Sequence, residues 1–192
     1  TGNGAAWDSR PLTEYLFGQT AYRQLYLAHI RTIMSESMGI DGIQQTVSAM
    51  QGLIVDAASE DNNSLFPMSF FSTNVNNAFW ADWGFGGILS TVEARMDFLA
   101  SHPEINVSTP LLADASAVNG VLEVSAMNAE SVELLWANAP YAGGFESAAL
   151  NDAGMNGDAT AGDGIYSLQL PPAAEPGFFF YFRAQNSEGI KL

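Results

Sequence analysis

The chain has 192 residues, of which 47% are apolar and 14% are charged, and its formal net charge is −15. This length and apolar content predict a packed core in one large domain or two small ones, and they exclude a largely disordered chain. The negative charge repels phosphate, so we expect neither nucleic acids nor anionic membrane surfaces as partners. No apolar run approaches the roughly 20 residues of a membrane-spanning helix, and the lack of cysteine excludes disulfides and thiolate metal sites.

The amino-terminal residues, TGNGAAWDS, are not a basic segment followed by an apolar one, and the chain does not begin with Met. We therefore expect no signal peptide and interpret the chain as a mature product or an excised piece of a longer protein.

Apolar residues recur with the helical period through most of the first half of the chain. The pattern predicts helices over 12–17, 20–38, 41–58, a short segment after Ser69, and 88–101. Thr20 and Asp41 are expected N-caps, Gly39 is expected to end a helix in a left-handed conformation, and His102-Pro103 is expected to end the last helix. The helices at 20–38, 41–58 and 88–101 each carry a predicted buried stripe, for example Ile43, Val47, Met50, Ile54 and Ala57. We expect these three helices to cover one another and to leave a residual apolar face exposed.

From residue 106 the apolar period changes from about 3.6 to 2, which is typical of strands. Six short segments alternate in this way, and turns rich in Gly, Pro, Asn and Asp separate them. They predict a β-sandwich of about 85 residues. The expected fold is therefore α+β with two domains, an α-helical one at 1–104 and an Ig-like β-sandwich at 105–192.

The segment NDAGMNGDATAGDG, residues 151–164, lies between two of the predicted strands. It contains four side chains that carry oxygen ligands of the kind Ca²⁺ prefers: Asp152, Asn156, Asp158 and Asp163. The spacing is not that of an EF-hand, because the D-x-[DN]-x-[DN]-G order and the later Glu are missing. A long hairpin in which Asp and Asn side chains accept backbone N–H groups explains the same residues, and we favour that interpretation.

Four aromatic residues lie within residues 79–85, and among them Trp80 and Trp83 are candidates for stacking on carbohydrate. The alternative is a small apolar cluster beneath a loop, which we favour. Only two histidines occur: His29 is expected in the core and His102 at a helix end. No nucleotide-binding, nucleophile or zinc-protease motif is present, so we predict no catalytic residue.

Several blocks of the first half, among them RPLTEYLF, AYRQLYLAHIRTIM and GILSTVEARMDFLASHPEI, resemble the C-terminal helical part of the spore-coat protein H (CotH) kinase-like family. In the second half, LNDAGMNGDATAGDGIYSLQLP and FFFYFRAQNSEG resemble Ig-like modules of large secreted bacterial proteins. The first resemblance implies an atypical kinase-like fold for a parent protein that transfers phosphate from Mg²⁺-ATP to Ser or Thr.

In that family the ATP-anchoring lysine and the metal-binding aspartates lie upstream of the matched region, and the single lysine here is Lys191. The resemblance therefore implies a non-catalytic C-terminal piece of a secreted bacterial protein, extracellular or at the cell surface, without a cofactor of its own unless it binds Ca²⁺. Its expected partners are the N-terminal lobe of the parent and an extracellular protein or polysaccharide. The alternatives are a carbohydrate- or calcium-binding accessory module and residual phosphotransfer activity.

Overall fold

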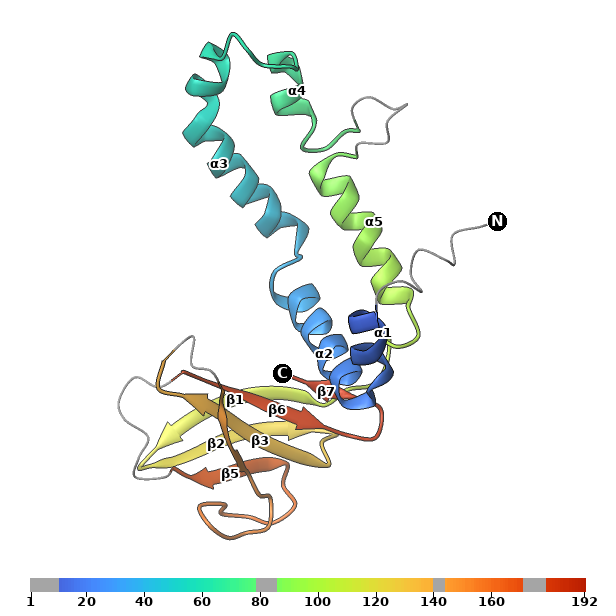
Figure 1. The fold of residues 1–192 in the computed structure, drawn as a ribbon. Helices are drawn as coiled ribbons and strands as arrows, with labels where there is room; N and C mark the ends of the chain where they lie inside the picture. Colours follow the sequence, from blue (N-terminus) through green and yellow to red (C-terminus); the bar gives the residue numbers. More distant parts are fainter. Residues whose placement is uncertain (1–10, 79–85, 140–143, 171–178) are drawn as a thin grey trace. The chain divides into compact units, whose positions relative to one another are not determined.

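A computed structural model describes residues 11–78, 86–139, 144–170 and 179–192 (Figure 1). The predicted α+β class is confirmed, since the described helices come first and two antiparallel sheets follow. The chain divides into two compact units, residues 1–29 together with 107–192, and residues 30–106. The domain boundary that we placed after residue 104 stays a prediction. Within the described ranges, no helix combines the length and the apolar character needed to cross a membrane.

The helices follow the predicted order. They are α1 (Pro11–Gly18), α2 (Thr20–Glu36), α3 (Ile40–Glu60), α4 (Met68–Thr73) and α5 (Ile88–Ser101). Three predicted caps are wrong. Thr20 lies inside α2, and the carbonyl of the preceding Gln19 accepts the Arg23 N–H at 3.0 Å. Asp41 lies in the first turn of α3, and the N-cap is Gly39, whose carbonyl accepts the Ile43 N–H at 3.0 Å. Gly39 is extended (φ −65°) and not left-handed, because it leads into a helix and does not close one.

The end of α5 matches the prediction, with His102 as the C-cap. Its backbone N–H donates to the Leu99 carbonyl at 3.0 Å, and its Nδ1 accepts the Glu104 N–H at 3.3 Å. Arg31 of α2 donates to the carbonyls of Glu104 (2.6 Å) and Ile105 (3.1 Å), which fastens the turn after α5. Partial burial lowers the pKa of the Arg31 guanidinium from its ordinary value.

The expectation that the helices cover one another's apolar stripes is only partly confirmed. The predicted positions Ile43, Val47, Val92, Met96 and Leu99 are half-buried, whereas Met50, Ile54 and Ala57 are exposed. In α2 only Ala28 is buried, and His29, expected in the core, is exposed. No residue of α3 is buried. The helix contacts α4 and α5, which cover only part of its circumference. A periodic pattern therefore marks the apolar face of each helix correctly, while the neighbours needed to bury that face are missing from the described residues.

The strands form a three-stranded sheet of order β1-β2-β5 and a four-stranded sheet of order β4-β3-β6-β7. Their bounds are β1 (Leu111–Val118), β2 (Val121–Met127), β3 (Ser131–Ala137), β4 (Glu146–Ala149), β5 (Ile165–Gln169), β6 (Phe179–Gln185) and β7 (Ile190–Lys191). The six predicted strands correspond to β1–β6, and β7 was not predicted because it has two residues. A single core joins both sheets, and its buried members are Leu122, Val124, Ala126, Val132, Leu134, Leu150 and Ala184.

One buried amide fastens the segment before β1 to the sandwich. The Asn186 side chain is 6% exposed, and its Nδ2 donates to the carbonyls of Ser108 (2.8 Å) and Asn128 (3.1 Å). Its Oδ1 accepts the N–H groups of Glu188 and Gly189, both at 3.0 Å. All four hydrogen-bonding positions of the amide are thus used, and this satisfies a polar group that would be costly to bury alone.

Candidate functional site

The loop 151–164 leads from β4 toward β5, and its two ends are tied together. Asn151 and Ser167 exchange backbone N–H···O bonds of 3.0 and 2.8 Å in an isolated antiparallel bridge. Between them the chain turns back through five left-handed positions, which are Gly154, Asn156, Gly157, Gly162 and Gly164. Gly157 has φ 102°, and a Cβ there would lie 2.9 Å from Cγ1 of Val121. This close approach explains why the loop needs glycine at that position.

Asp152 organises the second half of the loop from its half-buried position. Its Oδ1 accepts the N–H groups of Gly162 (2.7 Å) and Asp163 (3.2 Å), and its Oδ2 accepts the Gly164 N–H at 3.1 Å. One carboxylate thus satisfies three consecutive backbone donors. This is the role that the hairpin interpretation assigned to the aspartates of the loop.

Asp158 plays the same part in the first half of the loop, from a more buried position. It is 7% exposed, and its carboxylate accepts the Gly154 N–H at 2.5 Å and the Thr160 N–H at 3.3 Å. An almost fully buried carboxylate is rare unless hydrogen bonds or an opposite charge compensate for its lost hydration. The two N–H groups supply part of that compensation.

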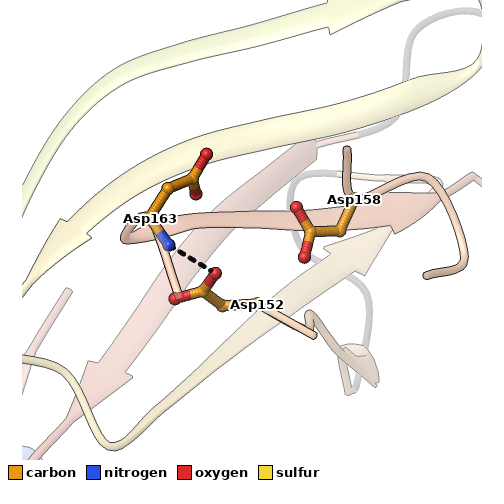
Figure 2. A group of neighbouring side chains, drawn as sticks. All are labelled: Asp152, Asp158 and Asp163. Carbon is orange, nitrogen blue, oxygen red and sulfur yellow. Dashed lines mark hydrogen bonds between the residues drawn. The ribbon is translucent and has the colours of Figure 1, made fainter. Parts of the chain in front are cut away.

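The fold brings three of the four predicted ligand residues together (Figure 2). One carboxylate oxygen each from Asp152, Asp158 and Asp163 lies within 4.8 Å of the others. Asn156 occupies a left-handed turn position (φ 55°), and its role as a ligand stays a prediction. Three like charges this close repel one another, and a divalent cation between them would reverse the sign of that interaction. Carboxylate oxygens in this arrangement suit Ca²⁺.

The negative charge of Asp152 also acts on a neighbouring side chain, Tyr166. The Tyr166 hydroxyl donates to the Ala129 carbonyl at 3.0 Å. Burial, and then the negative charge of Asp152, raise the pKa of the Tyr166 phenol above its ordinary value of 10.0. Both effects disfavour the phenolate anion, so Tyr166 is a neutral hydrogen-bond donor at neutral pH.

The other predicted ligand site, Trp80 and Trp83, lies outside the described residues, as do the neighbouring aromatics Phe79 and Phe85. The prediction that these tryptophans stack on carbohydrate therefore stays a prediction. Neither histidine takes part in the acidic group of the loop, which consists of aspartates alone.

A second surface feature is the exposed apolar face that the sequence led us to expect on the helices, and the structure shows it on α3. The carboxyl-terminal half of α3 exposes large apolar side chains, with exposed fractions of 59% for Met50, 85% for Leu53 and 52% for Ile54. Two of them, Met50 and Ile54, belong to the predicted buried stripe, so the sequence indicated the face but assigned it to the core. Leu53 was missed, although its spacing of three from Met50 places it beside that stripe.

Comparisons with protein-family models, curated proteins and solved structures find no match to this chain.

Proposed function

We propose that this chain is a non-catalytic C-terminal part of a secreted, CotH-like bacterial protein. Its helices complete the packing of a kinase-like lobe, and its β-sandwich serves as a spacer or interaction module. Two kinds of observation support the proposal: the resemblance of the sequence blocks described above, and the unburied apolar surface of the helices. The expected partner of the helical part is the N-terminal lobe of the parent protein.

The observation that carries the proposal is the exposure of α3. A helix of 21 residues with no buried side chain gains little from its own tertiary contacts, and an isolated helix is only marginally stable in water. Burying three side chains the size of Met50, Leu53 and Ile54 is worth on the order of 5 kcal/mol. A partner that covers this face would therefore stabilise both the complex and the helix.

The residue content also supports a role without phosphate transfer. Phosphoryl transfer uses a lysine to position the phosphates and carboxylates to hold Mg²⁺. The only lysine is Lys191, in the two-residue strand β7. We expect isothermal titration of the purified chain with Mg²⁺-ATP to give no heat of binding, and labelled ATP to keep its terminal phosphate. Release of that phosphate by the purified chain would instead support the alternative of residual phosphotransfer.

Polar substitution tests the docking role of α3. If the exposed face contributes nothing to the fold of the free chain, Leu53→Gln combined with Ile54→Gln leaves the free energy of unfolding within about 0.5 kcal/mol of the original. Leu89→Gln is the matched control, because Leu89 lies in α5 and is buried. Leu89→Gln should lower the free energy of unfolding by about 2 kcal/mol or more. A comparable loss in the α3 variant would mean that the face is already covered in the free chain, and would contradict the proposal.

A second candidate function, calcium binding by the loop 151–164, rests on the convergence of Asp152, Asp158 and Asp163. A ligand that binds only the native state raises its stability by mass action, about 2.7 kcal/mol at a hundredfold excess over the dissociation constant. We expect millimolar Ca²⁺ to raise the melting temperature, and Asp163→Asn to weaken this effect while preserving the fold. An unchanged melting temperature would leave the loop as a hydrogen-bonded turn only.

A further inference from the structure

The exposed apolar side chains of α3 form a continuous line. Residues three, four and seven apart lie on the same side of a helix, and this spacing joins four positions of α3. Together we call them the α3 stripe: Met50, Leu53, Ile54 and Ala57. Every member of the α3 stripe is exposed.

Two carboxylates border the α3 stripe on one side. Asp56 lies three residues after Leu53, and Glu60 lies three residues after Ala57, so both project along the same edge. Both residues are exposed. On the side of α3 that carries Gln51, the helix is already in contact with its own unit, since Gln51 Nε2 donates to the Phe71 carbonyl at 2.5 Å. The α3 stripe and its acidic edge are therefore open to a partner.

The sequence around the α3 stripe contains no compensating positive charge. No lysine or arginine occurs from residue 32 to residue 94, a range that includes all of α3. A second copy of this chain docked through the same face offers no basic residue of its α3 to pair with Asp56 and Glu60, and in the antiparallel orientation the two acidic edges lie on the same side. Like charges brought side by side repel one another, which disfavours this dimer. Charge complementarity thus favours a basic partner over self-association.

We infer that the α3 stripe binds an amphipathic helix of the partner protein whose apolar side chains are flanked by Lys or Arg. The inference rests on the proposed docking role of α3, and it specifies the chemistry of the partner. Apolar side chains of the incoming helix cover the α3 stripe, and its basic side chains pair with Asp56 and Glu60. This is the helix-in-groove mode of recognition, in which apolar contacts provide affinity and charges select the partner.

Two synthetic helical peptides of about 20 residues test the inference, since that length spans about 30 Å. Both carry the same apolar face, one flanked by lysine and the other by glutamate, and fluorescence anisotropy measures their binding to the complete chain. We expect the lysine-flanked peptide to bind at least about tenfold more tightly at low salt. The preference should shrink near 1 M salt, where the Debye length falls to about 3 Å.

Variants of the chain locate the interaction. Asp56→Asn with Glu60→Gln should abolish the preference for lysine and keep the apolar binding. Glu36→Gln with Asp41→Asn is the matched control, because it removes the same charge outside the acidic edge and should keep most of the preference. Leu53→Gln with Ile54→Gln should abolish binding of both peptides.

Three results would overturn the inference: no binding of either peptide, equal affinity for both, or a dimer of the free chain that Ile54→Glu dissociates. The last would identify a second copy as the occupant. The stability measurement on the Leu53→Gln, Ile54→Gln variant distinguishes a failure of this inference from a failure of the proposed function. If this variant is as stable as the original, equal peptide affinities refute only the charge preference, whereas a large loss of stability refutes the docking role itself.

Discussion

Replacing Asp152 by alanine is the most direct test of how the loop 151–164 is held. The substitution removes the acceptor of three backbone N–H groups, at 2.7, 3.2 and 3.1 Å. A hydrogen bond to a charged group contributes about 1.5–3 kcal/mol when it is well buried. Two of the three bonds are exposed, so water replaces the acceptor there at little cost. We therefore expect Asp152→Ala to lower the free energy of unfolding by about 2 kcal/mol in total.

Asp163→Ala is the matched control within the same loop. The Asp163 carboxylate accepts one exposed hydrogen bond, from the Ile165 N–H at 2.9 Å. Its removal should cost no more than about 1 kcal/mol. Urea unfolding followed by far-ultraviolet circular dichroism measures both variants. A chelator in the buffer removes any contribution of divalent cations. Equal losses for the two variants, or a loss below about 0.5 kcal/mol for Asp152→Ala, would refute the view that Asp152 organises the loop.

Three further predictions concern single residues of the sandwich and its loops. Asn186→Asp places a carboxylate opposite two carbonyls and should lower the free energy of unfolding by about 3 kcal/mol at neutral pH. Below about pH 4 the loss should be smaller, because a protonated carboxyl can donate a hydrogen bond again. An equal loss at both pH values would contradict this prediction. The raised pKa of Tyr166 means that its stabilising contribution is complete below about pH 10 and is lost as the pH rises through the folded-state pKa. Tyr166→Phe should therefore flatten the alkaline decline of the unfolding free energy, and an unchanged decline would argue against the shift. Gly157→Ala forces a Cβ against Val121 at a positive φ and should lower thermal stability by roughly 1–3 kcal/mol, whereas Gly162→Ala, with open space around it, should cost less.

Local periodicity explains why the secondary structure could be predicted. The spacing of apolar residues predicted α2, α3 and α5, and strict alternation predicted β2, where Leu122 and Val124 are buried. The end of α5 at His102 was predictable because Pro103 disfavours the helical conformation of the residue before it, and His102 is indeed extended. Such signals depend on the chain's own covalent geometry, so they can be read without knowing the fold.

Burial could not be predicted in the same way, because it depends on which segments come to lie against a face. The exposed His29 was assigned to the core since it follows the apolar spacing of α2. Met50 was assigned to the core for the same reason. Asn186 gave no signal in the sequence, although four hydrogen bonds to residues as distant as Ser108 make it the fastening point of the segment before β1.

The amino acids alone determined the class of the fold, the places of most helices and strands, and the presence of an aspartate- and glycine-rich loop, because each depends on interactions between residues close in the chain. Tertiary structure decided which aspartates meet. The bridge between Asn151 and Ser167 closes the loop. The turns of the loop then bring one carboxylate oxygen from each of three aspartates within 4.8 Å of the others. Tertiary structure also decided that the exposed apolar face lies on α3, since coverage of a helix requires a neighbouring segment and no local pattern shows which helix lacks one.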